Sequence, residues 1–138
     1  MADDFTQCLV SNSRMAARAI TRRYDAYLRP FGLTSTQLSL MGLIRTAEKR
    51  SVSELAETRG FERTTLTRNL DRLQQMGLIA SQPAEKGNGR ICTITAKGEA
   101  LIQELLPLWR QAQADTKSHL TAAGFDDSLR VLKRLAAF

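Results

Sequence analysis

The chain has 138 residues, 43% of them apolar, so it can bury one hydrophobic core but is short for two independent domains. Lysine and arginine number 20 against 14 aspartate and glutamate residues, a formal net charge of +6 that favours phosphate-bearing partners, nucleic acid first. No apolar run approaches the roughly 18 residues of a membrane span, and Asp3 and Asp4 stand where a signal peptide would carry basic residues. We therefore expect a cytoplasmic protein without membrane segments.

Three helices are predicted in the first half of the chain. The first runs from about Phe5 to Leu28 and ends at the segment Pro-Phe-Gly at 30–32. Thr34 with Gln37 has the form of a capping box and opens the second helix. Ser51 with Glu54 repeats that pattern and opens a short helix, which stops at Gly60.

The segment FERTTLTRNLDRLQQMGLI, residues 61–79, predicts a further helix with two different faces. Leu66, Leu70 and Leu73 lie within roughly 40° of one another on a helical wheel and form an apolar stripe. The opposite side carries Thr64, Arg68, Asp71 and Gln75, flanked by Arg63 and Thr67. Gly77 closes the helix.

The second half of the chain predicts a hairpin followed by long helices. Residues 78–95 read as two short strands around a flexible basic tip, Glu85 to Arg90. A helical stretch follows from Thr95 towards Leu120, in which Pro107 should introduce a kink or start a new segment. The last helix is expected from Asp126 to Phe138.

The order of these elements indicates a mainly α protein with a small β-hairpin: a winged helix-turn-helix flanked by N- and C-terminal helices. In that arrangement the third helix of the lobe enters the major groove of DNA by its N-terminal half. The hairpin, or wing, reaches a neighbouring phosphate ridge or the minor groove. Double-stranded DNA is therefore the expected partner.

Three segments carry a resemblance to a known family: LTSTQLSLMGLI, SVSELAETRGFERTTLTRNLDRLQQMGLI and ITAKGEALI. Through them the chain resembles the MarR family of bacterial transcription regulators over nearly its whole length. The resemblance implies one domain over residues 1–138, with a DNA-binding lobe at about 34–95 and dimerisation helices at about 5–30 and 96–138. It also implies a homodimer on pseudo-palindromic DNA, often released by small aromatic or anionic ligands or by oxidation.

The candidate DNA-binding residues lie at the start of the lobe's third helix and in the wing. On the helix, arginine can read guanine and threonine can bond phosphate or touch a thymine methyl, although a solvated helix face is the alternative. The family's wing usually contains Asp-x-Arg, for which the tip here offers other residues. The full set is Arg63, Thr64, Thr65, Thr67 and Arg68 on the helix, Lys86, Asn88 and Arg90 in the wing, and Thr36 and Gln37 at the second helix.

The remaining candidate sites each have a plainer alternative. Tyr24, Tyr27, Phe31 and Trp109 could line an effector pocket where the family tends to place one, although such aromatic residues more often pack in a core. Cys8 could sense oxidants, as first-helix cysteines of some relatives do, or could simply be a small buried residue.

Metal, cofactor and enzyme chemistry find no support in the residues. The cysteines Cys8 and Cys92 stand far apart and the chain has a single histidine, His119, so the pattern indicates neither a zinc site nor a disulfide framework. No cofactor is expected. A catalytic triad, a pair of catalytic carboxylates and a phosphate-binding glycine loop are not recognisable either, so we expect no enzyme.

The sequence thus predicts a homodimeric transcription regulator, more often a repressor, that a ligand or oxidant releases from its operator. One alternative is a winged-helix module that binds protein. In such a module the third helix of the lobe would be neutral, and affinity for the partner would not depend on salt concentration. Another is a redox sensor of the same fold that acts through Cys8.

Overall fold

The computed structural model describes residues 3–47, 51–85, 87 and 89–138. Six α-helices, two short 3₁₀ helices and one hairpin make up this part of the chain. The elements are η1 (Phe5–Gln7), α1 (Leu9–Leu28), η2 (Arg29–Phe31), α2 (Ser35–Thr46), α3 (Val52–Thr58), α4 (Arg63–Gln75), β1 (Ile79–Pro83), β2 (Arg90–Ile94), α5 (Ala96–Leu120) and α6 (Ala122–Ala136). The mainly α fold class with a hairpin is therefore confirmed.

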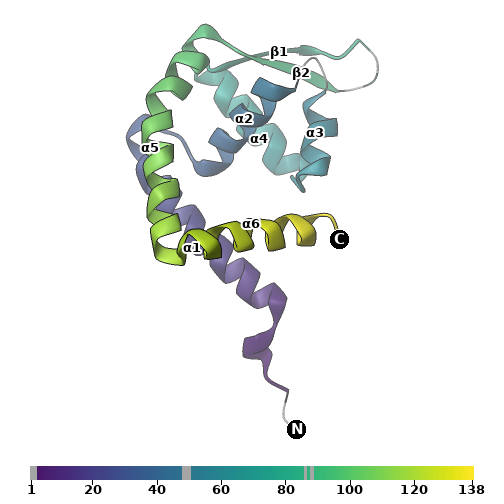
Figure 1. The fold of residues 1–138 in the computed structure, drawn as a ribbon. Helices are drawn as coiled ribbons and strands as arrows, with labels where there is room; N and C mark the ends of the chain where they lie inside the picture. Colours follow the sequence, from purple (N-terminus) through teal and green to yellow (C-terminus); the bar gives the residue numbers. More distant parts are fainter. Residues whose placement is uncertain (1–2, 48–50, 86, 88) are drawn as a thin grey trace.

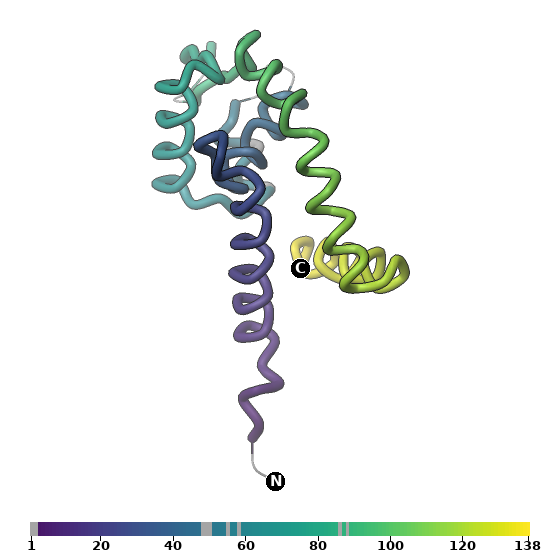
Figure 2. Tube along the Cα trace, turned by 90° about the vertical axis from the view of Figure 1, so that its left-hand side faces the viewer, coloured from purple at the N-terminus to yellow at the C-terminus, as the bar shows by residue number. Residues whose placement is uncertain are grey.

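The helices divide into a lobe and a set of helices outside it (Figure 1). Helices α2, α3 and α4 gather beneath the hairpin, and α5 runs from the hairpin along one side of the lobe. Helix α1 extends away from the lobe toward the N-terminus, and α6 turns back sharply from the far end of α5 (Figure 2). The lobe therefore holds the hairpin and α4 at the opposite end of the molecule from α1 and α6.

Side-chain caps set where the helices of the lobe begin. Thr34 Oγ1 accepts a hydrogen bond from the Gln37 N–H at 3.2 Å, and Gln37 Oε1 accepts one from the Thr34 N–H at 3.1 Å. This reciprocal pair is the predicted capping box. Ser51 Oγ accepts from the Glu54 N–H at 3.2 Å and caps the start of α3.

Glycine residues close two of these helices as predicted. Gly60 after α3 and Gly77 after α4 both have a φ of 74°, in the left-handed region that other residues adopt at a cost. The chain can therefore reverse direction within a few residues, which places α4 directly after α3 and the hairpin directly after α4.

One hydrophobic core holds the lobe and the first half of α5 together. Its fully buried members include Leu40 and Met41 of α2, Leu73 of α4 and Leu105 of α5. Leu66 and Leu70 join them, so the apolar stripe predicted on α4 does face inward. Packing in this core fixes which side of α4 remains outside.

The hairpin pairs β1 and β2 antiparallel, from Ile79 opposite Ile94 to Pro83 opposite Arg90. Beyond the last pair, the Ala84 N–H donates to the Gly89 carbonyl at 2.9 Å. Arg90 therefore belongs to a strand and not to the flexible tip in which the sequence reading placed it. The tip itself includes Lys86 and Asn88, which lie outside the described residues.

The outer helices differ from the sequence prediction in where α1 and α6 begin. Helix α5 continues through Pro107, so of the two predicted outcomes, a kink or a new segment, the new segment does not occur. A proline removes one N–H donor from a ladder of 25 residues, and the rest of the ladder remains. Helix α6 begins at Ala122 because Thr121 Oγ1 accepts from the Gly124 N–H and caps it. Helix α1 begins at Leu9, since the separate turn η1 occupies Phe5–Gln7.

A close approach at the start of α5 leads to a stability prediction. A Cβ added at Gly98 would lie 2.2 Å from the Leu78 carbonyl oxygen and 2.9 Å from Ile94 Cγ2. Gly98→Ala should therefore lower the free energy of unfolding by about 3 kcal/mol, measured by urea denaturation. The matched control is Gly42→Ala on α2, where the new Cβ meets nothing within 4 Å; it should raise stability by roughly 0.5–1 kcal/mol. Equal stability of the two variants would contradict the packing described.

Candidate nucleic-acid interface

Helix α4 lies with its apolar stripe on the core and its polar side in solvent. Leu66, Leu70 and Leu73 are buried, whereas the residues between them are largely exposed. Phe61, just before the helix, packs partly buried against the core and fixes the entry of the chain. The outward face is thus held rigidly by the inward one.

The outward face of α4 forms a shallow groove of about 690 Å³. Four of its lining residues are ones that the sequence predicted to face a partner: Arg63, Thr64, Thr67 and Arg68. Guanidinium and hydroxyl groups are the donors that proteins use toward phosphate oxygens and base edges. The complete lining is Arg63, Thr64, Thr67, Arg68, Asp71, Arg72 and Gln75.

Three members of the groove were not predicted as site residues: Asp71, Arg72 and Gln75. The helical wheel already placed Asp71 and Gln75 on the outer side, so periodicity could have identified them. The sequence prediction is confined to the basic and hydroxyl cluster at the start of the helix, which leaves these three residues out.

The first turn of α4 begins without a side-chain cap. Glu62 occupies the N-cap position and its side chain makes no capping hydrogen bond. The N–H groups of that turn therefore remain without a side-chain acceptor at the cap position, and they carry the positive end of the helix dipole. This end of α4 suits an anionic partner.

Thr65 differs from its neighbours on α4. It is half-buried and does not line the groove, and its carbonyl accepts a hydrogen bond from Asn69 Nδ2 at 2.9 Å. Its position one residue from Leu66 turns it toward the edge of the core. The structure therefore does not group Thr65 with the four groove residues predicted beside it.

The start of α2 also departs from the sequence prediction. Gln37 is only 8% exposed, its Oε1 is used in the capping box and its Nε2 donates to Asn69 Oδ1 at 3.3 Å. A side chain so engaged is not positioned for the phosphate contact expected of it. Thr36 is half-buried at the same end of α2.

Arg90 turns its guanidinium toward α4. Its Nη1 lies 2.9 Å from Asp71 Oδ1, and its Nη2 donates to Gln74 Oε1 at 2.8 Å and to Ser81 Oγ at 3.2 Å. Ser81 Oγ in turn donates to Gln74 Oε1 at 2.8 Å. This cluster, Asp71, Gln74, Ser81 and Arg90, joins both strands of the hairpin to α4 and is called the hairpin clamp below.

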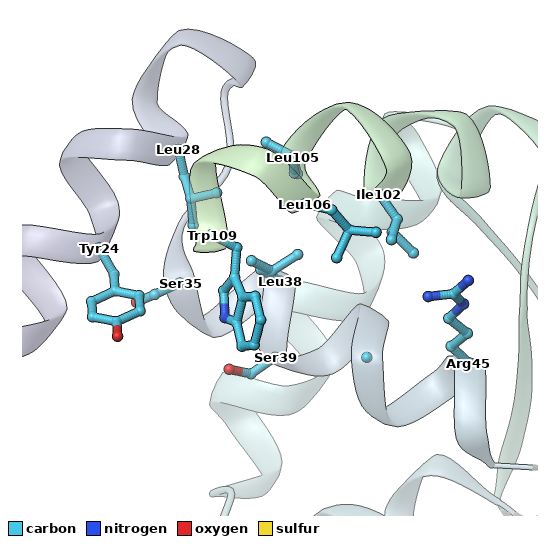
Figure 3. A pocket seen from close by; sticks show the side chains of 11 residues that line it. Tyr24, Leu28, Ser35, Leu38, Ser39, Arg45, Ile102, Leu105, Leu106 and Trp109 are labelled. Carbon is cyan, nitrogen blue, oxygen red and sulfur yellow. The ribbon is translucent and has the colours of Figure 1, made fainter. Parts of the chain in front are cut away.

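A second concave region lies between α1, α2 and α5 (Figure 3). It encloses about 400 Å³ and is lined mainly by apolar side chains, with Trp109 in its wall and Tyr24 at one edge. Arg45 stands at the other end and pairs with Glu99 at 2.6 Å. The lining is Tyr24, Leu28, Ser35, Leu38, Ser39, Gly42, Arg45, Ile102, Leu105, Leu106 and Trp109.

Only two of the four aromatic residues predicted for an effector pocket line this cavity. Tyr24 and Trp109 do, whereas Phe31 packs against the core and Tyr27 points to α5. The Tyr27 hydroxyl donates to Asp115, and this hydrogen bond raises the pKa of Tyr27. The lining members from α2 follow a helical spacing of three or four residues that could have been read from the sequence: Ser35, Leu38, Ser39, Gly42 and Arg45.

The two cysteines have opposite environments, which gives a testable difference in reactivity. Hydrogen bonds from Ser11, and then from the Val10 N–H, lower the pKa of Cys8, whereas burial raises the pKa of Cys92. Near neutral pH, Cys8 should react with Ellman's reagent at least about tenfold faster than Cys92, since the thiolate is the nucleophile. The Cys8→Ser variant should retain only the slow phase; two thiols with one common rate would contradict these assignments.

The residues that the structure describes hold neither a candidate metal site nor a candidate membrane span. Those residues contain no group of three or more His, Cys, Asp or Glu side chains arranged to hold a metal ion. None of the described helices combines the length and hydropathy that crossing a bilayer requires.

Comparison with known proteins places the chain among regulators. A sequence model of the MarR family matches residues 31–91. The M. tuberculosis transcriptional regulator MosR, solved in complex with DNA, is 36% identical, with a TM-score of 0.82 over 95% of this chain and 95% of that chain. YwoH of Bacillus subtilis, described as an uncharacterized HTH-type transcriptional regulator, is 27% identical over 97 residues, covering 70% of this chain and 71% of its own.

A more distant structure shares the fold. A mutant of E. coli MarR bound to operator DNA superposes with a TM-score of 0.81 at 23% identity, over 97% of this chain and 99% of that chain. The likeness thus extends beyond the lobe to the outer helices.

Proposed function

Because the chain belongs to the MarR family of transcriptional regulators, we propose that it binds operator DNA as a homodimer and controls transcription, without being an enzyme. The observation that carries this proposal is the outward groove of α4, where Arg63, Thr64, Thr67 and Arg68 stand on a helix fixed to the core. With α4 in the major groove, these side chains meet phosphates and base edges. Such a protein acts in the cytoplasm.

The apolar surfaces of α1 and α6 support the dimer. Leu129 and Leu132 on α6 are 41% and 53% exposed, and Leu9 and Met15 on α1 are 61% and 58% exposed. Helix α6 is clearly amphipathic, since its charged residues occupy the opposite side from these leucines. Apolar faces of this extent mark an interface, and we assign them to a second copy of the chain.

The dimer sets the operator that we expect. Two α4 helices related by a two-fold axis read an inverted repeat whose half-sites lie about one helical turn, roughly 34–36 Å, apart. In the proposed repressor, a ligand that changes the spacing of the two helices would lower the population bound to DNA.

The cavity between α1, α2 and α5 is the place that we propose for such a ligand. It touches helices from both parts of the molecule, so filling it can change how the lobe sits on the dimer helices. Its apolar walls, the Trp109 ring and the Arg45 guanidinium suit a small aromatic anion. Oxidation at Cys8 is a second route, favoured by the hydrogen bonds that lower the pKa of this thiol.

In vitro selection from a random duplex library tests the proposal. The full-length protein should enrich an inverted repeat with the half-site spacing given above, and footprinting should protect both halves. Recovery of no enriched sequence would contradict DNA recognition and favour a winged-helix module that binds protein. The enriched duplex is called the selected duplex below.

A further inference from the structure

The strand alternation of the hairpin directs Arg90 inward. Side chains two residues apart on a strand share a face, and Cys92, two residues after Arg90, is buried at 4% exposure. Arg90 therefore extends over the same inner face, toward α4. Its charge is close enough to Cys92 to act against the effect of burial on the pKa of that thiol.

The guanidinium of Arg90 is engaged on several sides at once. One nitrogen faces the Asp71 carboxylate, and the other is shared between the Gln74 amide oxygen and the Ser81 hydroxyl. An arginine fork that satisfies acceptors on two elements fixes their relative position better than a single bond does. The Arg90 side chain is 30% exposed, compared with 55% for Asp71.

The position of the Asp71 carboxylate explains why the charge of Arg90 matters for DNA binding. Its carboxylate lines the outward groove of α4 together with the three arginine residues Arg63, Arg68 and Arg72. A bare carboxylate on that face would repel the phosphates of a bound duplex. The Arg90 guanidinium lies 2.9 Å from it and balances the charge before DNA arrives.

We propose that Arg90 is a positioning residue of the DNA-reading surface: through the hairpin clamp it fixes the wing to the C-terminal half of α4 and neutralises Asp71, and it does not itself contact phosphate. This inference rests on the proposed DNA-binding function. It replaces the sequence-based expectation that Arg90 contacts DNA directly.

A double-mutant cycle on the selected duplex separates the two roles. Arg90→Ala should weaken binding by about tenfold, because it leaves Asp71 unpaired and frees the hairpin. In the Asp71→Asn background the same substitution should cost less than about threefold, since it then removes only the hydrogen bonds to Gln74 and Ser81 and no carboxylate remains to be neutralised. Equal costs in both backgrounds would overturn the proposal.

Salt dependence gives the second readout of the same variants. Loss of a phosphate contact lowers the slope of log Kd against log salt concentration by about 1 for each contact. Arg90→Ala should leave this slope unchanged, and a reduced slope would show that Arg90 contacts phosphate. Arg110→Ala on α5 removes the same charge away from the hairpin and serves as the control for general electrostatic effects.

Amide hydrogen exchange tests, without DNA, whether Arg90 holds the hairpin against α4. In free Arg90→Ala the amides of β2 should exchange faster than in the wild type, whereas Arg110→Ala should leave them unchanged. Unchanged exchange in Arg90→Ala would contradict the clamp. If the wild type selects no duplex, the proposed function fails, but this exchange experiment still decides whether Arg90 holds the hairpin.

Discussion

Replacing Arg63 and Arg68 together by alanine is expected to lower the affinity of the dimer for the selected duplex by at least about 100-fold. An arginine contact to a base is worth about 1–3 kcal/mol, and each dimer carries both residues twice. The two side chains line the outward groove at the N-terminal half of α4, which is the part of the helix that enters the major groove. Fluorescence anisotropy with the labelled selected duplex measures the change.

Two controls make this result interpretable. Arg110→Ala should change affinity by less than about threefold, because Arg110 is an exposed residue of α5 that does not line the outward groove, and exposed charges without a direct contact are screened at physiological salt. The double variant should unfold at the same urea concentration as the wild type, since both side chains are exposed. Unchanged affinity in a folded Arg63→Ala/Arg68→Ala protein would remove α4 from the interface.

The second large effect concerns oligomeric state. Leu129→Asp together with Leu132→Asp should convert the protein to a monomer, because both residues lie on the exposed apolar face of α6 and a carboxylate cannot be buried there without a partner. A monomer engages one half-site only, so affinity for the selected duplex should fall by about 100-fold or more. Sedimentation velocity and anisotropy measure the two consequences.

The matched control adds a carboxylate to the other face of the same helix. Arg130→Asp replaces an exposed residue whose ion pair with Asp127, 2.8 Å long, lies in solvent and contributes little. It should remain dimeric. A dimeric Leu129→Asp/Leu132→Asp protein would show that the two copies meet elsewhere.

Local rules predicted the lobe well because each of its elements is determined by nearby residues. The Thr34 capping box, the Gly60 and Gly77 helix ends and the leucine stripe of α4 all depend on contacts within one or two turns. At Pro107 the sequence leaves two outcomes open, a kink or a new segment, because the choice depends on contacts beyond the nearby residues. The hydrogen bonds on both sides of it, together with burial of Ile102, Leu105 and Ala112, support a helix that the proline alone would interrupt.

The candidate sites show the same difference between local features, which the sequence predicts, and contacts between distant residues, which it does not. Periodicity identified the outward face of α4, since which residues share a helix face is a local property. The partners of Gln37 and Arg90 could not be predicted, because Asn69 lies 32 residues from one and Asp71 lies 19 residues from the other. The cavity between α1, α2 and α5 depends on how these three helices pack together, so of the four aromatic candidates only Tyr24 and Trp109 line it.

The salt dependence of binding to the selected duplex, compared with a scrambled duplex of the same length, tests the central claim most directly. We expect the selected duplex to bind at least about 1000-fold tighter at physiological salt, with affinities for both duplexes falling steeply as salt rises. Phosphate contacts made by the groove on α4 account for the slope, and base contacts account for the difference between the duplexes. Equal affinity for the two duplexes, or binding that does not change with salt, would contradict a DNA-reading function for this protein.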